Sequence, residues 1–206
     1  MSQLLSACPD VVIECAGQAA LGELGPQILA AGIDLVPAAI GTLANDAVRQ
    51  ALKEACRKGG GRLLAPSGAL AGLDGLSAAL HVGLDEVTYR GSAPPENWEP
   101  LKVPPSDSAV VLFSGSAREA CRAFPKNANV AAAVSLAGLG FDATKVELRA
   151  DAALSCSRHE IIARGAFGEL STTVLGQPLV AGKRSSRLAA GSLAQTALTR
   201  SSLMRF

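Results

Sequence analysis

The first part of the chain alternates between short runs of β-branched residues and longer, helix-like segments. Three short apolar runs, at residues 11–16, 33–38 and 62–65, predict buried strands. Between them, residues 17–31 and 43–57 predict helices, and glycines follow each of these two segments as helix terminators. Because strands and helices alternate with short links, the strands are expected to run parallel, joined by right-handed crossovers. The pattern predicts half of a doubly wound sheet of the kind that binds nucleotides.

Beyond residue 68 the pattern changes, and the later segments alternate apolar and polar positions. Strands are expected at residues 85–91, 110–114, 145–150, 159–166 and 170–174. Helices are expected at residues 117–123, 129–139 and 185–204. The period-two alternation of the last strands favours an antiparallel or mixed sheet with one face toward solvent. The final helix, with Ser185 or Ser186 as its N-cap, is expected to return to the first part of the chain.

These patterns predict an α/β protein of two domains. Residues 1–68, completed by the C-terminal helix at residues 184–206, would form a partial nucleotide-binding domain around the parallel sheet. Residues 69–183 would form an α+β domain that carries the mixed or antiparallel sheet.

Composition narrows the class of protein. The 206 residues carry a formal net charge of +1, which argues against a nucleic-acid partner. No apolar run of about 18 residues and no signal-like N-terminus occurs, so we expect no membrane association. The five cysteines are odd in number and have no CxxC spacing, which favours reduced thiols in the cytoplasm over disulfides or a zinc site.

The turns that follow the three N-terminal strands hold small residues. These residues include Ala16, Gly17, Gly41, Gly68 and Ala69. Ligands of open parallel sheets bind at this edge, and small residues would let a ribose or a nicotinamide lie against the backbone. Each turn alone is an ordinary strand-to-helix connection, and the sequence contains no Gly-x-Gly-x-x-Gly phosphate turn. A cofactor edge and plain structural turns therefore both stay open.

Histidine is the other candidate for chemistry, because it titrates near neutral pH and is the commonest general acid or base. The chain has two histidines, His81 and His159. The place of His81 at the end of a helical segment favours a structural role, whereas both a structural and a functional role stay open for His159. Two histidines without acidic neighbours at ligand spacing do not make a metal site. The sequence lacks a Gly-x-Ser-x-Gly elbow, which argues against a hydrolase.

A series of motifs resembles the L-aspartate dehydrogenase family, in the same order along the chain. No single motif is specific, but the combination is, and it covers nearly the whole sequence. The motifs are Pro9-Asp-Val-Val-Ile-Glu-Cys-Ala-Gly17, Ile40-Gly-Thr-Leu43, Pro66-Ser-Gly-Ala69, Gly72-Leu-Asp74, the segments 124–134 and 140–151, His159-Glu-Ile161 and Gly165-Ala-Phe-Gly168.

The resemblance implies a Rossmann domain followed by an α+β substrate domain. It also implies oxidation of L-aspartate to iminoaspartate with NAD or NADP, after which iminoaspartate gives oxaloacetate and ammonia or feeds NAD biosynthesis. His159 matches the family's catalytic histidine, Asn129 matches its asparagine contact to the cofactor, and Ala69 matches a small-residue contact to the same cofactor. The family forms homo-oligomers, so a homodimer or a larger assembly is expected.

The substrate implied by the resemblance carries two carboxylates, which need cationic or hydrogen-bonding partners. We take Ser67, Lys126 and Arg158 as the candidates for this role. The two cations are otherwise ordinary surface charges, so their role in substrate binding is a hypothesis.

The chain also departs from the family pattern. The family's Gly-rich turn and the residue that selects NAD or NADP precede the part that matches here, so the coenzyme preference stays open. The family's Asn-Pro-Lys-Thr-Ser before the last helix reads Ala-Gly-Lys-Arg-Ser-Ser at residues 181–186, and Ser157 stands where the family often has Asn. Two alternatives follow: a non-catalytic, truncated member that acts as a binding or interaction protein, and another two-lobed reductase similar to dihydrodipicolinate reductase.

Overall fold

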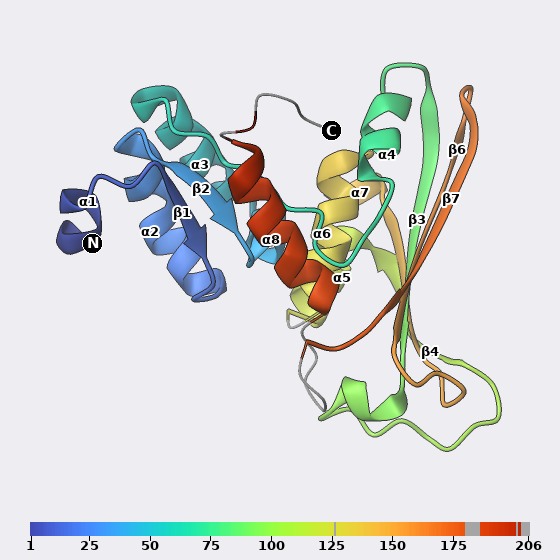
Figure 1. Cartoon of the computed structure of the whole chain (residues 1–206). Coiled ribbons are helices and arrows are strands. Elements are labelled where there is room, and N and C mark those ends of the chain that lie inside the picture. The colour runs from blue at the N-terminus through green and yellow to red at the C-terminus, as the bar shows by residue number, and fades with distance from the viewer. Residues whose placement is uncertain (126, 180–185, 201, 203–206) are drawn as a thin grey trace.

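The computed structural model describes residues 1–125, 127–179, 186–200 and 202, and it shows two lobes side by side (Figure 1). The N-terminal lobe contains α1 (Ser2–Ser6), β1 (Val11–Glu14), α2 (Gln18–Ala30), β2 (Asp34–Pro37), η1 (Ile40–Ala44) and α3 (Asp46–Gly59). The sheet lobe contains α4 (Leu73–Ala79), β3 (Leu84–Ala93), η2 (Pro95–Trp98), β4 (Val110–Ser116), α5 (Ala117–Ala123), α6 (Ala128–Ala137), α7 (Gly140–Ala143), β5 (Lys145–Ala150), β6 (Ser157–Gly165) and β7 (Gly168–Gly176). The last helix, α8 (Arg187–Thr199), lies where the two lobes meet. In the described part of the chain, no helix is long and apolar enough to cross a bilayer.

The N-terminal lobe has the parallel strand–helix arrangement that the sequence predicts. β1 and β2 pair in parallel, and α2 and α3 pack against each other beside them. Fully or almost fully buried leucines fill the space between these elements. They are Leu21, Leu29, Leu35 and Leu52.

The prediction of a third strand at residues 62–65 is wrong, because this segment does not form a regular strand. The segment makes a single parallel bridge, between Leu63 and Leu35, and the backbone of Leu35 makes two hydrogen bonds of 2.8 Å with it. Pro66 follows and has no N–H to donate, so the pairing does not extend.

The three glycines at the end of α3, Gly59 to Gly61, allow two segments of backbone to cross closely. Gly60 is the C-cap of α3 and has a φ of 79°, in the left-handed region that glycine adopts without strain. A Cβ atom on Gly59 would lie 2.3 Å from the carbonyl oxygens of Leu29 and Ala30, so no other residue fits there. The glycines thus end the helix, as expected, and let it pack against the end of α2.

The sheet lobe is built on a mixed five-stranded sheet in the order β4-β5-β3-β6-β7. β3 at its centre runs parallel to β5 and antiparallel to β6, and the two outer pairs are antiparallel. Figure 1 shows α4, α5, α6 and α7 on the side of the sheet that faces the N-terminal lobe, and no labelled helix on its other side. One face of the sheet is therefore turned toward the helices and the other is uncovered.

Helix α8 returns to the N-terminal lobe, as expected. At its C-terminal end, Arg200 donates a hydrogen bond of 2.6 Å to the Asp34 carboxylate in β2. In its middle, Ser192 Oγ accepts a hydrogen bond of 3.0 Å from the backbone N–H of Gly68. Ser186, one of the two serines expected as the N-cap, accepts a hydrogen bond of 3.2 Å from the first turn of the helix.

Candidate active site

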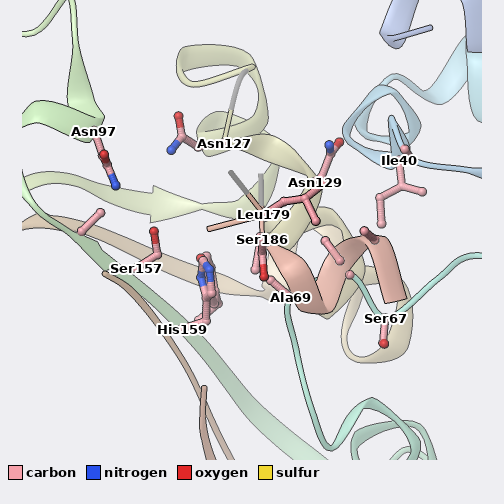
Figure 2. Close-up of a pocket in the computed structure, with 18 of the residues that line it drawn as sticks. Ile40, Ser67, Ala69, Asn97, Asn127, Asn129, Ser157, His159, Leu179 and Ser186 are labelled. Atoms are coloured by element: carbon pink, nitrogen blue, oxygen red, sulfur yellow. The ribbon is translucent and has the colours of Figure 1, made fainter. Parts of the chain in front are cut away.

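A cavity of about 620 Å³ lies where the two lobes and α8 meet (Figure 2). The N-terminal lobe contributes the ends of β1 and β2, and the connection to the sheet lobe contributes residues 67–69. The sheet lobe contributes β3, β6 and the start of α6, and α8 contributes its N-terminal half. This volume suits a small-molecule ligand. The cavity brings together His159 and Asn129, which come from different elements of the sheet lobe.

His159 in β6 lines this cavity, and its environment keeps the imidazole neutral. Its Nδ1 atom lies 2.9 Å from the hydroxyl of Tyr89, and the two rings stack with centroids 6.1 Å apart. Burial lowers the pKa of His159 to about 4, because the charged form would lose its hydration. Burial also raises the pKa of Tyr89, so the phenol stays protonated. A neutral imidazole can accept a proton, which is what a general base must do.

Asn129 and Gly41, expected on separate grounds to contact a cofactor, are in direct contact with each other. Asn129 lies in the first turn of α6, and its Oδ1 atom accepts a hydrogen bond of 2.9 Å from the N–H of Gly41 in η1. The same side chain lines the cavity (Figure 2). This bond joins the two lobes at the edge of the cavity and leaves the Nδ2 group of Asn129 as a hydrogen-bond donor.

The turn at residues 67–69 lines the cavity, as the cofactor-edge hypothesis requires. Ser67, Gly68 and Ala69 all contribute to its wall. Gly68 has a φ of 64°, and no atom outside its chain neighbours lies within 4 Å of the position that a Cβ would take. The backbone there is open to the cavity, and the hydrogen bond to Ser192 of α8 holds it in place.

The turn after β1 lies beside the cavity, and Cys15 is its contribution to the wall. Ala16 and Gly17 do not belong to the described wall residues. Their backbone N–H groups each donate a hydrogen bond of 2.6 Å to the same carboxylate oxygen of Glu14. Contacts of Ala16 and Gly17 with a cofactor stay a prediction.

Glu14 was not singled out from the sequence, although it holds together the sheet edge at which a cofactor is expected. Its side chain is buried, and its second carboxylate oxygen accepts a hydrogen bond of 3.3 Å from the N–H of Ala39, after β2. One buried carboxylate thus connects the turns that follow β1 and β2. The signal was present in the sequence, because a glutamate within an apolar strand must find donors when it is buried.

Of the two cations expected to bind substrate, the structure describes only Arg158, since Lys126 lies outside the described residues. Arg158 neighbours His159 in β6, so its side chain projects from the opposite face of the sheet. There it pairs with Glu160, at 3.0 Å. The structure therefore does not bring Arg158 to the cavity that His159 lines.

Several polar residues that were not selected from the sequence as site residues also line the cavity. They are Tyr89, Asn97, Asn127, Ser157 and Ser186. Ser157 lies two residues before His159 and so on the same face of β6. Figure 2 shows these side chains, Tyr89 excepted, labelled around the same space as His159. Within the described part of the chain, no group of three or more His, Cys, Asp or Glu side chains could hold a metal ion.

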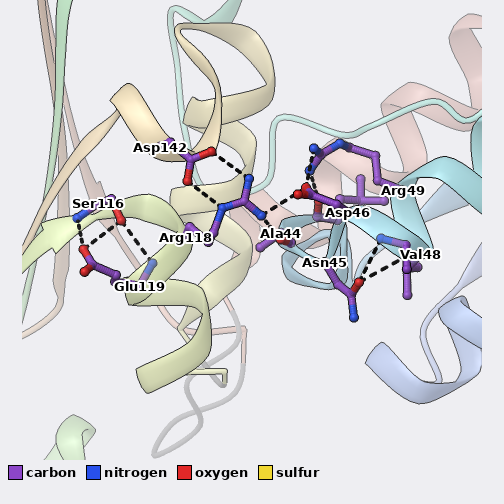
Figure 3. Close-up of polar contacts among 11 residues, drawn as sticks. Ala44, Asn45, Asp46, Val48, Arg49, Ser116, Arg118, Glu119 and Asp142 are labelled. Carbon is purple, nitrogen blue, oxygen red and sulfur yellow. Dashed lines mark hydrogen bonds and ion pairs between the residues drawn. The ribbon is translucent and has the colours of Figure 1, made fainter.

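The two lobes are also held together by Arg118, at the start of α5 (Figure 3). Its guanidinium makes two hydrogen bonds to the Asp142 carboxylate, at 2.6 and 2.8 Å. It also reaches the N-terminal lobe, with hydrogen bonds of 2.6 Å to the carbonyl of Ala44 and 3.0 Å to Asp46. These contacts fix the position of η1, and with it Gly41, against the sheet lobe.

Comparison with known proteins agrees with this architecture. Residues 1–66 match the family described as homoserine dehydrogenase, NAD binding domain, and residues 74–200 match the family described as aspartate dehydrogenase, C-terminal. The fold has two lobes, a parallel sheet and a cavity that a histidine lines. Together with these matches, it defines the class of protein as a dehydrogenase built on an NAD-binding domain.

Individual relatives define the family. The chain is 51% identical over 195 residues to L-aspartate dehydrogenase 1 of Bordetella pertussis. The aligned region covers 95% of this chain and 76% of that relative. It is 43% identical to L-aspartate dehydrogenase of Serratia proteamaculans, over 91% of this chain and 73% of that one. The crystal structure of aspartate dehydrogenase from Thermotoga maritima matches with a TM-score of 0.81 at 27% identity, covering 96% of this chain and 78% of that one. The chain belongs to the L-aspartate dehydrogenase family.

Proposed function

We propose that this protein oxidises L-aspartate to iminoaspartate with NAD or NADP, and that His159 is its catalytic residue. The observation that carries the proposal is that the His159 imidazole lines the same cavity as Asn129, and burial, which lowers the pKa of His159 to about 4, is consistent with a neutral imidazole there. The named relatives are L-aspartate dehydrogenases, and none of the comparisons favours a non-catalytic binding protein.

The residues around the cavity fit a nicotinamide group. A flat ring needs an apolar surface, and Ile40, Val130 and the open backbone of Gly68 offer one. A carboxamide needs hydrogen-bonding partners, and Asn129 has its Nδ2 donor left after its Oδ1 atom has bound Gly41. We therefore assign Asn129, Gly68 and Ala69 to the cofactor, with Gly41, Ala16 and Gly17 beside the cavity wall. When bound, the nicotinamide supplies the acceptor for the hydride that leaves Cα of the substrate.

The protein's own contribution is to move a proton and to orient the substrate. Loss of a hydride from Cα and of a proton from nitrogen converts the amine of aspartate to the imine. His159 is neutral and lines the cavity, so it takes the proton from the amine, or later from the water that adds to the imine carbon. Addition of water and loss of ammonia give oxaloacetate, and unhydrolysed iminoaspartate is available to NAD biosynthesis.

The substrate carboxylates need hydrogen-bond donors on the cavity wall. Ser157 and Asn97 lie near His159 on the side of the sheet lobe, and Ser67 lies on the connection between the lobes. We propose that these side chains bind the carboxylates. Lys126 stays a candidate from the sequence alone, and Arg158 is a weaker one because it projects from the other sheet face.

The uncovered face of the sheet is the proposed contact between subunits of a homo-oligomer. It carries a network of alternating charges, in which Arg90 lies 3.3 Å from Glu147 and 3.8 Å from Glu160. Arg158 on this face is half-exposed, but its buried Nε atom has no hydrogen-bond partner within the described structure. All five cysteines are thiols in the described structure, which supports the reducing cytoplasm expected from the sequence.

The experiment that tests the function is the formation of reduced nicotinamide from L-aspartate with NAD and, separately, with NADP. We expect turnover by the unaltered chain and loss of at least 100-fold in kcat for His159→Ala, which is the lower range of a general base's contribution. His81→Ala is the matched control, because His81 is exposed and does not line the described cavity. Equal activity in the two variants would overturn the assignment of His159. Coenzyme binding without turnover in the unaltered chain would favour the binding-protein alternative.

A further inference from the structure

Tyr89 in β3 is placed to determine which nitrogen of His159 carries the proton. We propose that Tyr89, seated above Gly91, is a positioning residue that keeps the His159 proton on Nδ1 and so leaves the Nε2 lone pair for the substrate. The inference rests on the proposed role of His159 as a general base, and it adds a residue that does not itself touch the reacting atoms.

The contact between the two side chains is short and well oriented. The Tyr89 hydroxyl lies 2.9 Å from His159 Nδ1, and the ring planes are inclined by only 23°. Tyr89 is almost fully buried, with 2% of its surface exposed, so its ring has little freedom to move away. Since a neutral imidazole has one N–H, Nε2 keeps a lone pair when Nδ1 donates to the hydroxyl, and it carries the proton when Nδ1 accepts from the hydroxyl.

Gly91 makes this contact possible, because it leaves room for the tyrosine ring. Tyr89 and Gly91 lie on the same face of β3, two residues apart, and Gly91 is directly opposite His159 in the β3–β6 pair. A Cβ atom on Gly91 would lie 2.6 Å from the Tyr89 hydroxyl oxygen and 3.1 Å from the ring carbon that bears it. Any side chain at this position would therefore push the phenol away from the place where it meets His159.

Proton acceptance by the cavity-facing nitrogen requires one tautomer. With the proton on Nδ1, the N–H donates to the phenol oxygen, and Nε2 keeps its lone pair. Burial raises the pKa of Tyr89, so the phenol remains a neutral acceptor and does not become a phenolate that would hold a second proton on the imidazole. Tyr89 also lines the cavity, so the hydroxyl lies beside His159 at its wall.

Few other titratable groups face His159. Among the described residues that line the cavity, only Cys15 and Tyr89 titrate besides His159 itself. The charged side chains of the neighbouring strands project from the opposite face of the sheet, since they alternate with the cavity-facing positions. Those nearest to His159 in the sheet register are Arg90, Glu147, Arg149, Arg158 and Glu160.

The test combines nitrogen NMR of the imidazoles with the pH profile of turnover. The chain has two histidines, so the spectra contain two imidazoles, and a His81→Asn variant assigns them. We expect the unaltered protein to show His159 with its proton on Nδ1. Tyr89→Phe keeps the ring and removes the hydroxyl, and it is expected to shift His159 toward the Nε2–H tautomer. The kcat should fall by about tenfold, a fraction of the 100-fold or more that a general base contributes, with KM less affected.

Two further variants separate positioning from a general loss of structure. Gly91→Ala keeps Tyr89 but displaces it, and it should reproduce the tautomer shift of Tyr89→Phe. Thr88→Val removes a hydroxyl from the opposite face of β3 and should leave both the spectrum and the pH profile unchanged. An Nε2–H tautomer in an active, unaltered protein, or an unchanged tautomer in Tyr89→Phe, would overturn the inference. An Nδ1–H tautomer in a protein that does not turn over aspartate would count against the proposed function instead.

Discussion

The side chain of Asn129 in α6 binds the backbone of Gly41 in η1, with a hydrogen bond of 2.9 Å that crosses from one lobe to the other. The two residues are 88 positions apart in the sequence. Gly41 follows β2 at the edge of the parallel sheet, whereas Asn129 opens a helix of the sheet lobe. The Asn129 side chain thus helps to hold the two lobes together at the edge of the proposed cofactor site.

Replacement of Asn129 by Ala is expected to weaken coenzyme binding. The variant leaves the buried Gly41 N–H without its acceptor and removes the amide donor from the cavity, and an unsatisfied buried group costs about 1–3 kcal/mol. We expect the Kd for NAD or NADP, measured by isothermal titration calorimetry, to rise by about tenfold. Asn45→Ala is the control, because Asn45 caps α3 away from the cavity, with hydrogen bonds to Ala47 and Val48. Equal coenzyme affinity in Asn129→Ala and the unaltered chain would contradict the assignment.

Arg118 is expected to contribute to stability because it connects three carboxylate or carbonyl partners across the lobes (Figure 3). Its side chain is only 15% exposed, and the partners Asp46 and Asp142 hold its pKa above the usual value. Removal of bidentate and charge-assisted bonds costs about 1–3 kcal/mol, so Arg118→Ala should lower the unfolding free energy by that amount in urea denaturation. Arg122→Ala, one turn along α5 and exposed, should change it by less than about 0.5 kcal/mol. Similar losses of unfolding free energy in both variants would show that the loss of one positive charge, and not the contacts of Arg118, lowers the stability.

The sequence predicted those parts of the fold that depend on local pattern. Residues 117–123 and 145–150 were predicted with the bounds that the structure has, since each has a clear period and a clear terminator. The pairing of β3 with β5 in parallel could not be predicted, because it depends on a connection that passes through β4 and three helices. The bridge at Leu63 shows the same limit, since an apolar run predicts burial but not how far its pairing extends.

The candidate site was predictable to the extent that single residues carried a signal. His159 and Asn129 matched the family's motifs, and both line the cavity. Tyr89 gave no such signal, because a tyrosine in an apolar strand usually fills a core, and only the register of β3 against β6 brings it to His159. Arg158 is the opposite case, a residue that was selected from the sequence but that the structure does not bring to the cavity. Its closeness in sequence to His159 suggested a shared role, but neighbours in a strand project from opposite faces.

The ion pairs of Asp34 are expected to secure α8 to the N-terminal lobe. Burial alone would raise the pKa of Asp34, but hydrogen bonds from Arg62 and Arg200 outweigh it and lower the pKa to about 2. A carboxyl group with a depressed pKa stabilises the protein above its unfolded pKa, near 4, and this contribution is lost as the pH falls toward 2. Asp34→Asn should therefore lower the unfolding free energy at pH 7 by about 2 kcal/mol and reduce the loss of stability in that acid range.

Asp10→Asn is the matched control for this prediction. Asp10 also faces Arg200, at 3.4 Å, but 85% of its side chain is exposed, and exposed pairs contribute about 0–1 kcal/mol. Chemical denaturation at a series of pH values compares the two variants. An equal effect of both would mean that burial of Asp34 does not strengthen its contacts with Arg62 and Arg200.

The neutral state of His159 predicts a second range of pH dependence, at less acidic pH. Its pKa is lowered by burial from 6.5 to about 4, so between these values the unfolded chain binds a proton that the folded protein does not. Stability must then rise with pH across this range and fall as the pH drops from 6.5 to 4, with no further contribution below 4. The change is at most about 3 kcal/mol, from 1.36 kcal/mol per pKa unit.

In His159→Gln this dependence should disappear from denaturation curves measured between pH 7 and 4, whereas His81→Gln should retain it, because His81 is exposed. A His159→Gln protein that loses stability over this range as steeply as the unaltered chain would mean that burial does not lower the pKa of His159 in the folded protein.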